Sequence, residues 1–130
     1  MIDKIAYLYI KDGKILSTRS KGKDAYYIPG GKREGQESDI ETLIREVKEE
    51  LSVDILPNTT KLYGVFKAQA HGHAEGITVQ MTCYMADFTG NMKADNEIEE
   101  IRWLTMADQD IISPVDKLIF AQLNRDGLLD

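Results

Sequence analysis

The sequence has a single cysteine, Cys83, and no apolar stretch long enough to cross a membrane. A lone cysteine cannot form an intramolecular disulfide, which is typical of proteins in a reducing compartment. The charged and apolar regions of a signal peptide are missing as well. We therefore expect a cytoplasmic protein that does not reside in a membrane.

Basic residues are also scarce, because 16 Lys and Arg stand against 22 Asp and Glu, for a net charge of −6. Proteins that bind nucleic acid or anionic membranes usually carry a basic surface, so this balance argues against both partners. Internal repeats and low-complexity segments are absent, and 130 residues suffice for one hydrophobic core. The sequence predicts one domain over residues 1–130.

Three glutamates have a spacing that folding alone does not require. Glu46, Glu49 and Glu50 lie at i, i+3 and i+4, which places their carboxylates on one stripe of a helix. The opposite stripe of the same segment is apolar and consists of Ile40, Leu43, Ile44, Val47 and Leu51. Ser38 followed by Glu41 fits a capping box at the helix start. The pattern predicts a helix with one buried face and one acidic face.

The acidic stripe has two interpretations. Such a stripe is usually a solvated face, even though like charges one turn apart destabilise a helix slightly. Alternatively, a hard divalent cation such as Mg²⁺ would bind several of these carboxylates together with substrate phosphates. Just ahead of the helix, Pro29, Gly30 and Gly31 predict a tight loop. The residues around the stripe decide between the two interpretations.

The order of residues from Gly31 onward is specific. After Gly31 come five residues, Glu37, seven residues, and then the run Arg45-Glu46-Val47-Lys48-Glu49-Glu50-Leu51-Ser52-Val53. Over residues 31–53 this resembles the Nudix box, G-x5-E-x7-R-E-U-x-E-E-x-G-U with U aliphatic, at every defined position except one. Ser52 stands where the box has its final Gly, and that Gly closes the helix. The departure therefore concerns the helix end more than the chemistry.

The resemblance implies an α/β fold, namely an α/β/α sandwich with a mixed β-sheet and a loop-helix-loop catalytic motif. It also implies an enzyme that hydrolyses a nucleoside diphosphate linked to another moiety, with Mg²⁺ or Mn²⁺ as cofactor. In phosphoryl transfer the protein mainly positions water and cations and neutralises charge on oxygens, which clustered carboxylates do.

Matched position by position, Glu49 and Glu50 would be metal ligands. Glu46 would be a further ligand or the base that activates water. Arg45 would orient the glutamates through charge-assisted hydrogen bonds, with Glu37 as its partner.

Residues outside the helix complete the implied site. Gly30 and Gly31 would let the backbone approach the cation or the phosphates, with the Gly30 carbonyl as an additional ligand and Gly31 as a substrate contact. Gly31, Glu37 and Ser52 would also serve the structure of the motif. Arg19, at the end of a predicted strand, would reach a phosphate or be an ordinary surface arginine.

Members of the family often carry another acid on a loop before a strand with a Trp. Glu97, Glu99 and Glu100 all precede Trp103 in this chain. We favour Glu97, because its six-residue offset from the Trp resembles the fourth ligand of MutT-like members. Glu99 and Glu100 otherwise form a solvated edge. The base is then Glu46 or one of these loop glutamates.

Two tyrosines and two histidines leave their roles open. Tyr26 and Tyr27 alternate faces, so one would stack on a base while the other packs in the core; Tyr27 is the candidate substrate contact. His71 and His73 have no cysteine or third ligand nearby, which is weak support for zinc. We expect them in a solvent loop or at the substrate.

The rest of the chain alternates strand and turn signals. Residues 5–10 and 14–19 flank an Asp-Gly turn and predict a hairpin. Further strands are expected over residues 26–28, 62–68, 77–88 and 101–104, with an acidic loop over residues 95–100. Ser113 and Pro114 open a final helix, whose predicted buried residues are Val115, Leu118, Ile119 and Leu123.

Substrate choice depends on residues outside the box, which carry few signals. Gln69 stands where ADP-ribose pyrophosphatases have a Pro, and the Tyr of dinucleoside polyphosphate hydrolases is missing. We therefore predict hydrolysis of a nucleoside triphosphate, oxidised or noncanonical ones included, to the monophosphate and pyrophosphate. A nucleotide sugar, ADP-ribose or a dinucleoside polyphosphate is the alternative substrate, and a non-catalytic nucleotide sensor is the alternative class. A homodimer is common among similar proteins.

Overall fold

The computed structural model describes residues 1–130, which form nine strands and two α-helices. The strands are β1 (Ile2–Tyr7), β2 (Ile10–Lys11), β3 (Lys14–Ser20), β4 (Gly30–Lys32), β5 (Asp54–Ile55), β6 (Lys61–Gln69), β7 (Thr78–Met85), β8 (Phe88–Thr89) and β9 (Ile98–Leu104). The helices are α1 (Asp39–Leu51) and α2 (Pro114–Arg125), with short 3-10 helices η1 (Pro57–Thr59) and η2 (Met106–Ile111).

The strands form a mixed sheet, as predicted. The largest sheet has the order β4-β1-β7-β6, in which β1 and β7 are parallel and the outer pairs are antiparallel. A second sheet has the order β2-β3-β9, and β5 pairs with β8 alone. Strand β1 therefore lies between two strands, namely β4, which leads to α1, and β7, which comes from the second half of the chain.

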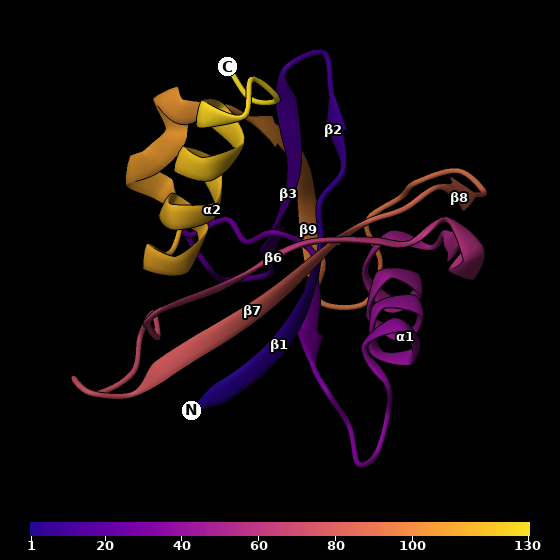
Figure 1. Ribbon diagram of the computed structural model, residues 1–130, viewed down its shortest axis with the longest axis horizontal. Coiled ribbons are helices and arrows are strands. Elements are labelled where there is room, and N and C mark those ends of the chain that lie inside the picture. The colour runs from indigo at the N-terminus through magenta and orange to yellow at the C-terminus, as the bar shows by residue number, and fades with distance from the viewer.

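The two helices lie on opposite sides of these strands (Figure 1). The apolar face of α1 packs on Ile5 and Tyr7, whereas the apolar face of α2 packs in the cluster that contains Ala6 and Leu8. Successive side chains of a strand point to opposite faces, so β1 contributes to both cores. The predicted α/β/α sandwich is confirmed.

The first hairpin differs from the prediction. Asp12 and Gly13 form the expected turn, with φ of 54° and 76°. However, the apolar run before the turn is not one strand, because β1 ends at Tyr7 and pairs in one sheet, whereas β2 starts at Ile10 and pairs in another. The run is buried on both faces at this crossing, so its hydrophobicity does not reveal where the strand changes sheet.

Two other segments also differ from the prediction. Tyr26 and Tyr27 form only isolated bridges, and the strand lies further on at β4, which includes Gly30 and Gly31. Strand β9 starts at Ile98, so part of the predicted acidic loop pairs with β3. Composition misled the prediction because Gly and Glu are depleted in strands in general.

Helix α2 begins with the predicted cap, in which Ser113 accepts a hydrogen bond from a backbone N–H of the first turn. Val115, Ile119 and Leu123 are buried as expected. The prediction is wrong for Leu118, which is 47% exposed because it lies outside the stripe that faces the sheet.

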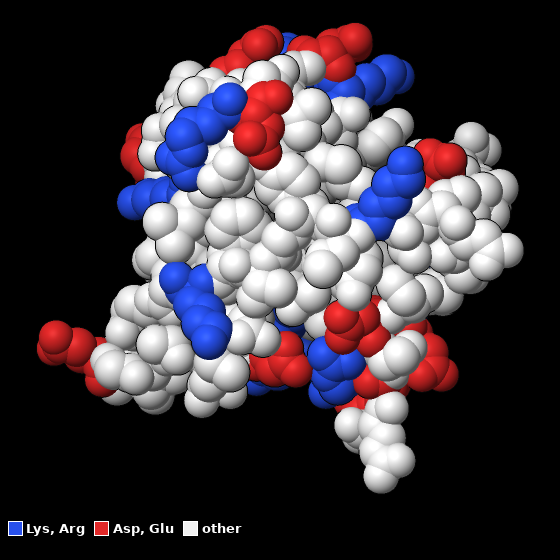
Figure 2. Space-filling model, viewed as in Figure 1, with Lys and Arg blue, Asp and Glu red and all other residues white.

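None of the helices combines the length and the apolar character that a membrane span needs. Figure 2 shows few charged side chains over the middle of one face. Strand β6 is the outer strand of its sheet and exposes Leu62 and Val65. A second copy of the chain could add to such an edge. The homodimer stays a prediction.

Candidate active site

The helix α1 is built as the sequence predicts. Ser38 and Glu41 make both hydrogen bonds of the capping box, at 2.8 and 3.1 Å. The fully buried residues of its apolar stripe are Leu43, Val47 and Leu51. Their packing fixes the rotation of the helix about its axis, so that Glu46 and Glu50 face β4.

The helix ends at Leu51, where the box places its end. Ser52 adopts the left-handed conformation, with φ of 61° and ψ of 24°, and its N–H donates to the Lys48 carbonyl at 3.1 Å. Glycine reaches this conformation without the steric cost that a Cβ brings. Ser52 therefore takes the conformation of the missing Gly with some backbone strain.

Arg45 binds the other residues of the motif through its guanidinium group. Its nitrogens donate to the Glu37 carboxylate at 2.8 and 2.9 Å, to Glu46 Oε1 at 2.9 Å and to the Lys32 carbonyl at 3.0 Å. This hydrogen bonding by Arg45 is the main reason that the pKa of Glu37 falls to about 2. Arg45 thus ties the loop, the strand β4 and Glu46 together.

The two glycines of β4 allow the helix and the strand to approach closely. A Cβ on Gly31 would lie 2.4 Å from Cδ of Glu46, and a Cβ on Gly30 would lie 2.0 Å from the carbonyl oxygen of Ile5. Gly30 also has a φ of 140°, which side chains disfavour. Position 30 therefore requires glycine, whereas a Cβ at position 31 would displace the carboxylate of Glu46. Both residues lie in a strand and not in the predicted loop.

Two of the three helix glutamates are partly or largely buried beneath β4. Glu50 is 8% exposed and accepts a hydrogen bond from the Gly30 N–H at 2.8 Å. Its burial, reinforced by the charges of Glu46, Glu97 and Glu49, raises its pKa to about 8. Burial also raises the pKa of Glu46, against the lowering effect of Arg45. Glu49, by contrast, is exposed.

Of the three later glutamates, Glu97 is the one whose charge acts on this cluster. It adds to the effect of burial in raising the pKa of both Glu46 and Glu50. Glu100 instead accepts hydrogen bonds from the Tyr26 hydroxyl at 2.5 Å and from Arg19. Glu100 is thus engaged in its own sheet, and the choice of Glu97 from its offset to the Trp stays a prediction.

Arg19 lies away from this cluster and binds carboxylates of its own sheet. Its guanidinium contacts Glu99 at 3.1 Å and Glu100 at 3.3 Å. Its neighbours Thr18 and Ser20 line the cavity described below, but Arg19 itself does not. These ion pairs fit the interpretation of Arg19 as a surface arginine, and its contact with a phosphate stays a prediction.

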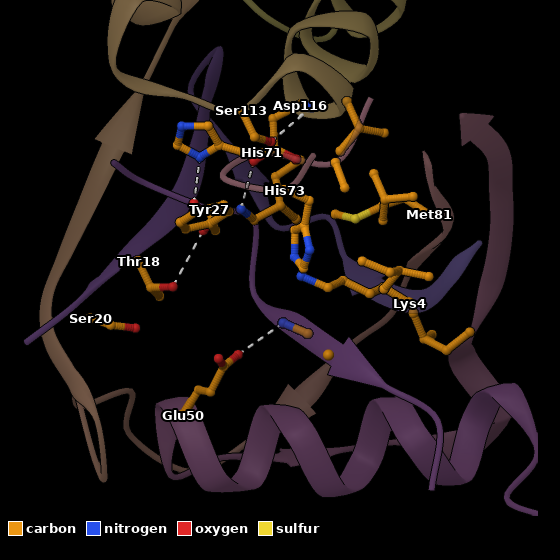
Figure 3. Close-up of a pocket in the computed structure, with 18 residues that line it drawn as sticks. Lys4, Thr18, Ser20, Tyr27, Glu50, His71, His73, Met81, Ser113 and Asp116 are labelled. Atoms are coloured by element: carbon orange, nitrogen blue, oxygen red, sulfur yellow. Dashed lines mark hydrogen bonds between the residues drawn. The ribbon is translucent and has the colours of Figure 1, made fainter. Parts of the chain in front are cut away.

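A cavity of about 340 Å³ opens beside the glutamates (Figure 3). Glu50 reaches it from α1 at one end, and Asp116 reaches it from α2 at the other end. Apolar side chains line the wall between them, namely Ile2, Ile5, Ile28, Ala70, Val79, Met81 and Val115. The other lining residues are polar or glycine, and a pocket that combines an apolar wall with convergent polar groups is typical of a small-molecule site.

Tyr27 is the tyrosine that lines this cavity, whereas Tyr26 is 6% exposed and packs in the core. The structure thus answers which of the two rings faces the ligand side. The Tyr27 hydroxyl lies 2.6 Å from Nδ1 of His71, and both His71 and His73 line the cavity. The histidines therefore belong to the cavity wall. Lys4 lies on the same wall, with its Nζ 6.0 Å from the centre of the Tyr27 ring.

Asp116, an acid in the first turn of α2, is not among the predicted site residues, but it is fully buried and lines the cavity. Its Oδ2 accepts a hydrogen bond from the Ile28 N–H at 3.0 Å, and its Oδ1 has no partner. Burial raises the pKa of Asp116 to about 7, although Lys4 acts to lower it. The sequence contains a signal for the burial of Asp116, because this residue lies at i, i+3, i+7 spacing with Ile119 and Leu123 on the buried stripe of the helix.

The donor set at the Glu50 end fits a hard divalent cation. No three His, Cys, Asp or Glu side chains already form a metal cage, because Arg45 binds Glu46 and Gly30 binds Glu50. Mg²⁺ needs no such cage, since it keeps several waters and is completed by substrate phosphates. Burial is the main cause of the raised pKa of Glu46 and Glu50, and the charges of neighbouring glutamates add to it; a bound cation would oppose both effects.

Comparisons with known proteins agree with this geometry. The model of the NUDIX domain matches residues 4–122. No curated protein matches the sequence well enough to count as a relative. The chain belongs to the Nudix family, whose members hydrolyse substrates that contain a nucleoside diphosphate linked to another moiety.

Solved structures show the same fold. The E. coli ORF135 protein is 25% identical, with 100% of this chain and 95% of that chain covered at a TM-score of 0.74. A MutT Nudix hydrolase from Burkholderia pseudomallei is 20% identical, with 94% of this chain and 97% of that chain covered at a TM-score of 0.77. A UDP-X diphosphatase is 18% identical, with 97% of this chain and 63% of that chain covered at a TM-score of 0.70. The fold is thus shared by proteins named for different activities, and it does not identify the substrate.

Proposed function

We propose that this protein hydrolyses a nucleoside triphosphate to the monophosphate and pyrophosphate, with Mg²⁺ or Mn²⁺. The observation that carries the proposal is the continuity between the glutamates and the cavity, because Glu50, Gly30 and Gly31 belong to both. A triphosphate beside these glutamates would have its nucleoside in the cavity. The cavity volume of about 340 Å³ lies near the lower end for ligand sites, which favours a single nucleoside over a dinucleotide.

In this proposal Glu46, Glu49, Glu50 and Glu97 hold the cation, and the Gly30 carbonyl is a further ligand. Bound there, the cation would polarise a phosphoryl oxygen and make its water more acidic. The protein keeps the ligands in place through Arg45, which binds Glu46 at 2.9 Å, and through the Gly30 N–H, which binds Glu50 at 2.8 Å. The contribution of the chain is therefore preorganised charge and position.

Glu46 is the proposed base. Arg45 occupies its Oε1, so that Oε2 remains to accept a proton from the attacking water. The bond to Arg45 favours the ionised form that a base needs, whereas burial opposes it. Glu97 is the alternative base, since its charge acts on the same cluster.

We propose the Asp116 end of the cavity as the site of the nucleobase. Tyr27 and Met81 offer faces on which an aromatic ring packs. The free Oδ1 of Asp116 accepts an N–H from the edge of the base, and the amino group of Lys4 donates to an acceptor. Such an arrangement favours a nucleobase with an amino group over one with a carbonyl at the same position, because a carbonyl oxygen and Oδ1 of Asp116 are both acceptors and repel each other.

A panel of substrates tests the proposal. Nucleoside triphosphates, a nucleotide sugar, ADP-ribose and a dinucleoside polyphosphate would each be incubated with Mg²⁺ or Mn²⁺ and the products separated by chromatography. We expect turnover of a triphosphate to monophosphate and pyrophosphate. Faster turnover of one of the other substrates would replace the triphosphate. Tight nucleotide binding without turnover of any substrate would instead support the nucleotide sensor.

A further inference from the structure

Ser52, the residue that departs from the Nudix box, makes a contact that glycine cannot make. Its hydroxyl donates to Oδ2 of Asp95 at 3.0 Å, across 43 positions of the sequence. Asp95 belongs to the loop that leads to Glu97 and then into β9. The residue at the end of the catalytic helix is therefore bonded to the loop that carries the candidate fourth ligand.

This loop also caps the C-terminus of α1. The backbone N–H groups of Lys93 and Asp95 donate to carbonyls of the last helical turn at 3.0 and 3.1 Å, and the side chain of Asn96 donates to another at 2.7 Å. The last turn of a helix leaves such carbonyls without partners in the helix. The Asp95 side chain accepts the Asn96 N–H at 2.8 Å through Oδ1, and the Ser52 hydroxyl adds the bond to Oδ2 that ties this side chain to the helix end.

Glu97 is the next residue along the chain after those that make these contacts. Asn96 has a φ of 51°, a left-handed conformation that Asn tolerates, and it turns the chain beyond the helix end. The carbonyl of Glu97 then accepts a hydrogen bond from the Lys21 N–H at 2.8 Å. Glu97 is thus held between α1 and the end of β3.

We propose that Ser52 is a positioning residue, which through Asp95 holds Glu97 beside Glu46 and Glu50. The inference rests on the proposed function, in which Glu97 is a ligand of the cation. Glycine at position 52 would relieve the left-handed backbone but would leave the Asp95 side chain bonded only within its own loop, to the Asn96 N–H. The chain therefore tolerates local strain and gains a contact that reaches the site.

Amide hydrogen exchange of the protein without metal or substrate tests the contact. We expect Ser52→Gly and Ser52→Ala to speed exchange at Asp95 and Asn96 by about three- to tenfold, the effect of one lost hydrogen bond. Ser52→Asn should restore the slow exchange, because Asn tolerates the left-handed conformation and its amide can donate to Asp95.

The matched control is Thr60→Ala, which removes a hydroxyl bond of 2.9 Å to the Pro57 carbonyl elsewhere on the surface. It should leave exchange at Asp95 and Asn96 unchanged. Unchanged exchange at both amides in Ser52→Gly and Ser52→Ala would overturn the proposal.

A double-mutant cycle with Glu97→Gln tests the consequence for the site. Ser52→Gly should lower kcat by about three- to tenfold in the parent and have no further effect in Glu97→Gln. An equal loss in both backgrounds would overturn the positioning role. If no substrate is turned over, the proposed function fails, and Mn²⁺ affinity measured by titration calorimetry replaces kcat in the same cycle.

Discussion

The cavity has a buried carboxylate at each end, and the two are alike in their immediate contacts. Glu50 is 8% exposed and Asp116 is fully buried. Each accepts one backbone N–H, from Gly30 at 2.8 Å and from Ile28 at 3.0 Å. Burial is the largest cause of the raised pKa in both, to about 8 for Glu50 and about 7 for Asp116.

The charges around the two carboxylates differ. Glu46, Glu97 and Glu49 raise the pKa of Glu50 further, whereas Lys4 acts to lower the pKa of Asp116. A cluster of like charges is relieved by a cation. A single carboxylate with an unpartnered oxygen is satisfied by one N–H donor. The same functional group therefore suits a cation at one end and a neutral base edge at the other.

The largest effect is expected from Glu46→Gln, which keeps the shape of the side chain but removes the proton acceptor. At saturating Mn²⁺ we expect kcat to fall about 10²- to 10⁴-fold, with KM within a few fold of the parent. Steady-state kinetics measure both. The control is Glu41→Gln on the same helix, because Gln also completes a capping box. A kcat close to that of the parent would transfer the role of base to Glu97.

Glu50→Gln should weaken the cation end alone. We expect Mn²⁺ affinity to fall by about 10- to 100-fold, because one charged ligand and part of its orientation are lost. Nucleotide affinity measured without metal should change little, since the proposed contacts with the nucleobase lie at the Asp116 end. Calorimetric titrations with Mn²⁺ and with a nucleotide separate the two effects. Unchanged Mn²⁺ affinity would remove Glu50 from the ligand set.

Asp116→Asn should reverse the selectivity at the other end. The amide oxygen would keep the Ile28 N–H, which turns the NH₂ group towards the cavity in place of Oδ1. We expect the ratio of kcat/KM for CTP over UTP, and for ATP over ITP, to fall by about tenfold or more. Asp24→Asn, at an exposed position, is the control. Ratios that stay constant would exclude a contact between Asp116 and the base.

The smallest effect concerns stability against pH. Both carboxylates have pKa values above their ordinary range in the folded protein, so the folded state binds protons more tightly. Their contribution to stability is full at low pH and is lost as the pH rises through about 7 for Asp116 and about 8 for Glu50.

Urea unfolding should therefore show parent stability falling between about pH 5 and pH 9. At about pH 9 the free energy of unfolding of Asp116→Asn, and likewise of Glu50→Gln, should exceed that of the parent by ~1–3 kcal/mol, relative to the values at about pH 5. Added Mg²⁺ should reduce the fall that comes from Glu50 but not the fall that comes from Asp116. A parent whose stability is independent of pH would contradict both assignments.

The cation end was predictable from the sequence because one helix sets its geometry. The spacing of Glu46 and Glu50, the cap at Ser38 and the apolar stripe all follow from the period of a single helix. Arg45 and Glu37 are only eight positions apart, so their pairing is also close to local.

The Asp116 end of the cavity was not predictable in the same way, because its contacts join segments that are distant in the sequence. Asp116 binds Ile28 across 88 positions, and Tyr27 meets His71 across 44. Arg19 fits a phosphate role from its place in the chain alone, but β9 brings Glu99 and Glu100 to it. Residue order does not contain that register, which arises only when the strands pair.

Strand β1 has a consequence for how such an enzyme can change over time. Ile5 and Tyr7 pack with α1, whereas Ala6 and Leu8 pack in the core of α2. A substitution in the α2 core can therefore reshape the base pocket while the residues under α1 keep the glutamates aligned. Ile5 lines the cavity from the α1 side, but most of the apolar wall belongs to the α2 core. Under the proposed function, the preference for a nucleobase can therefore change with little effect on the glutamates.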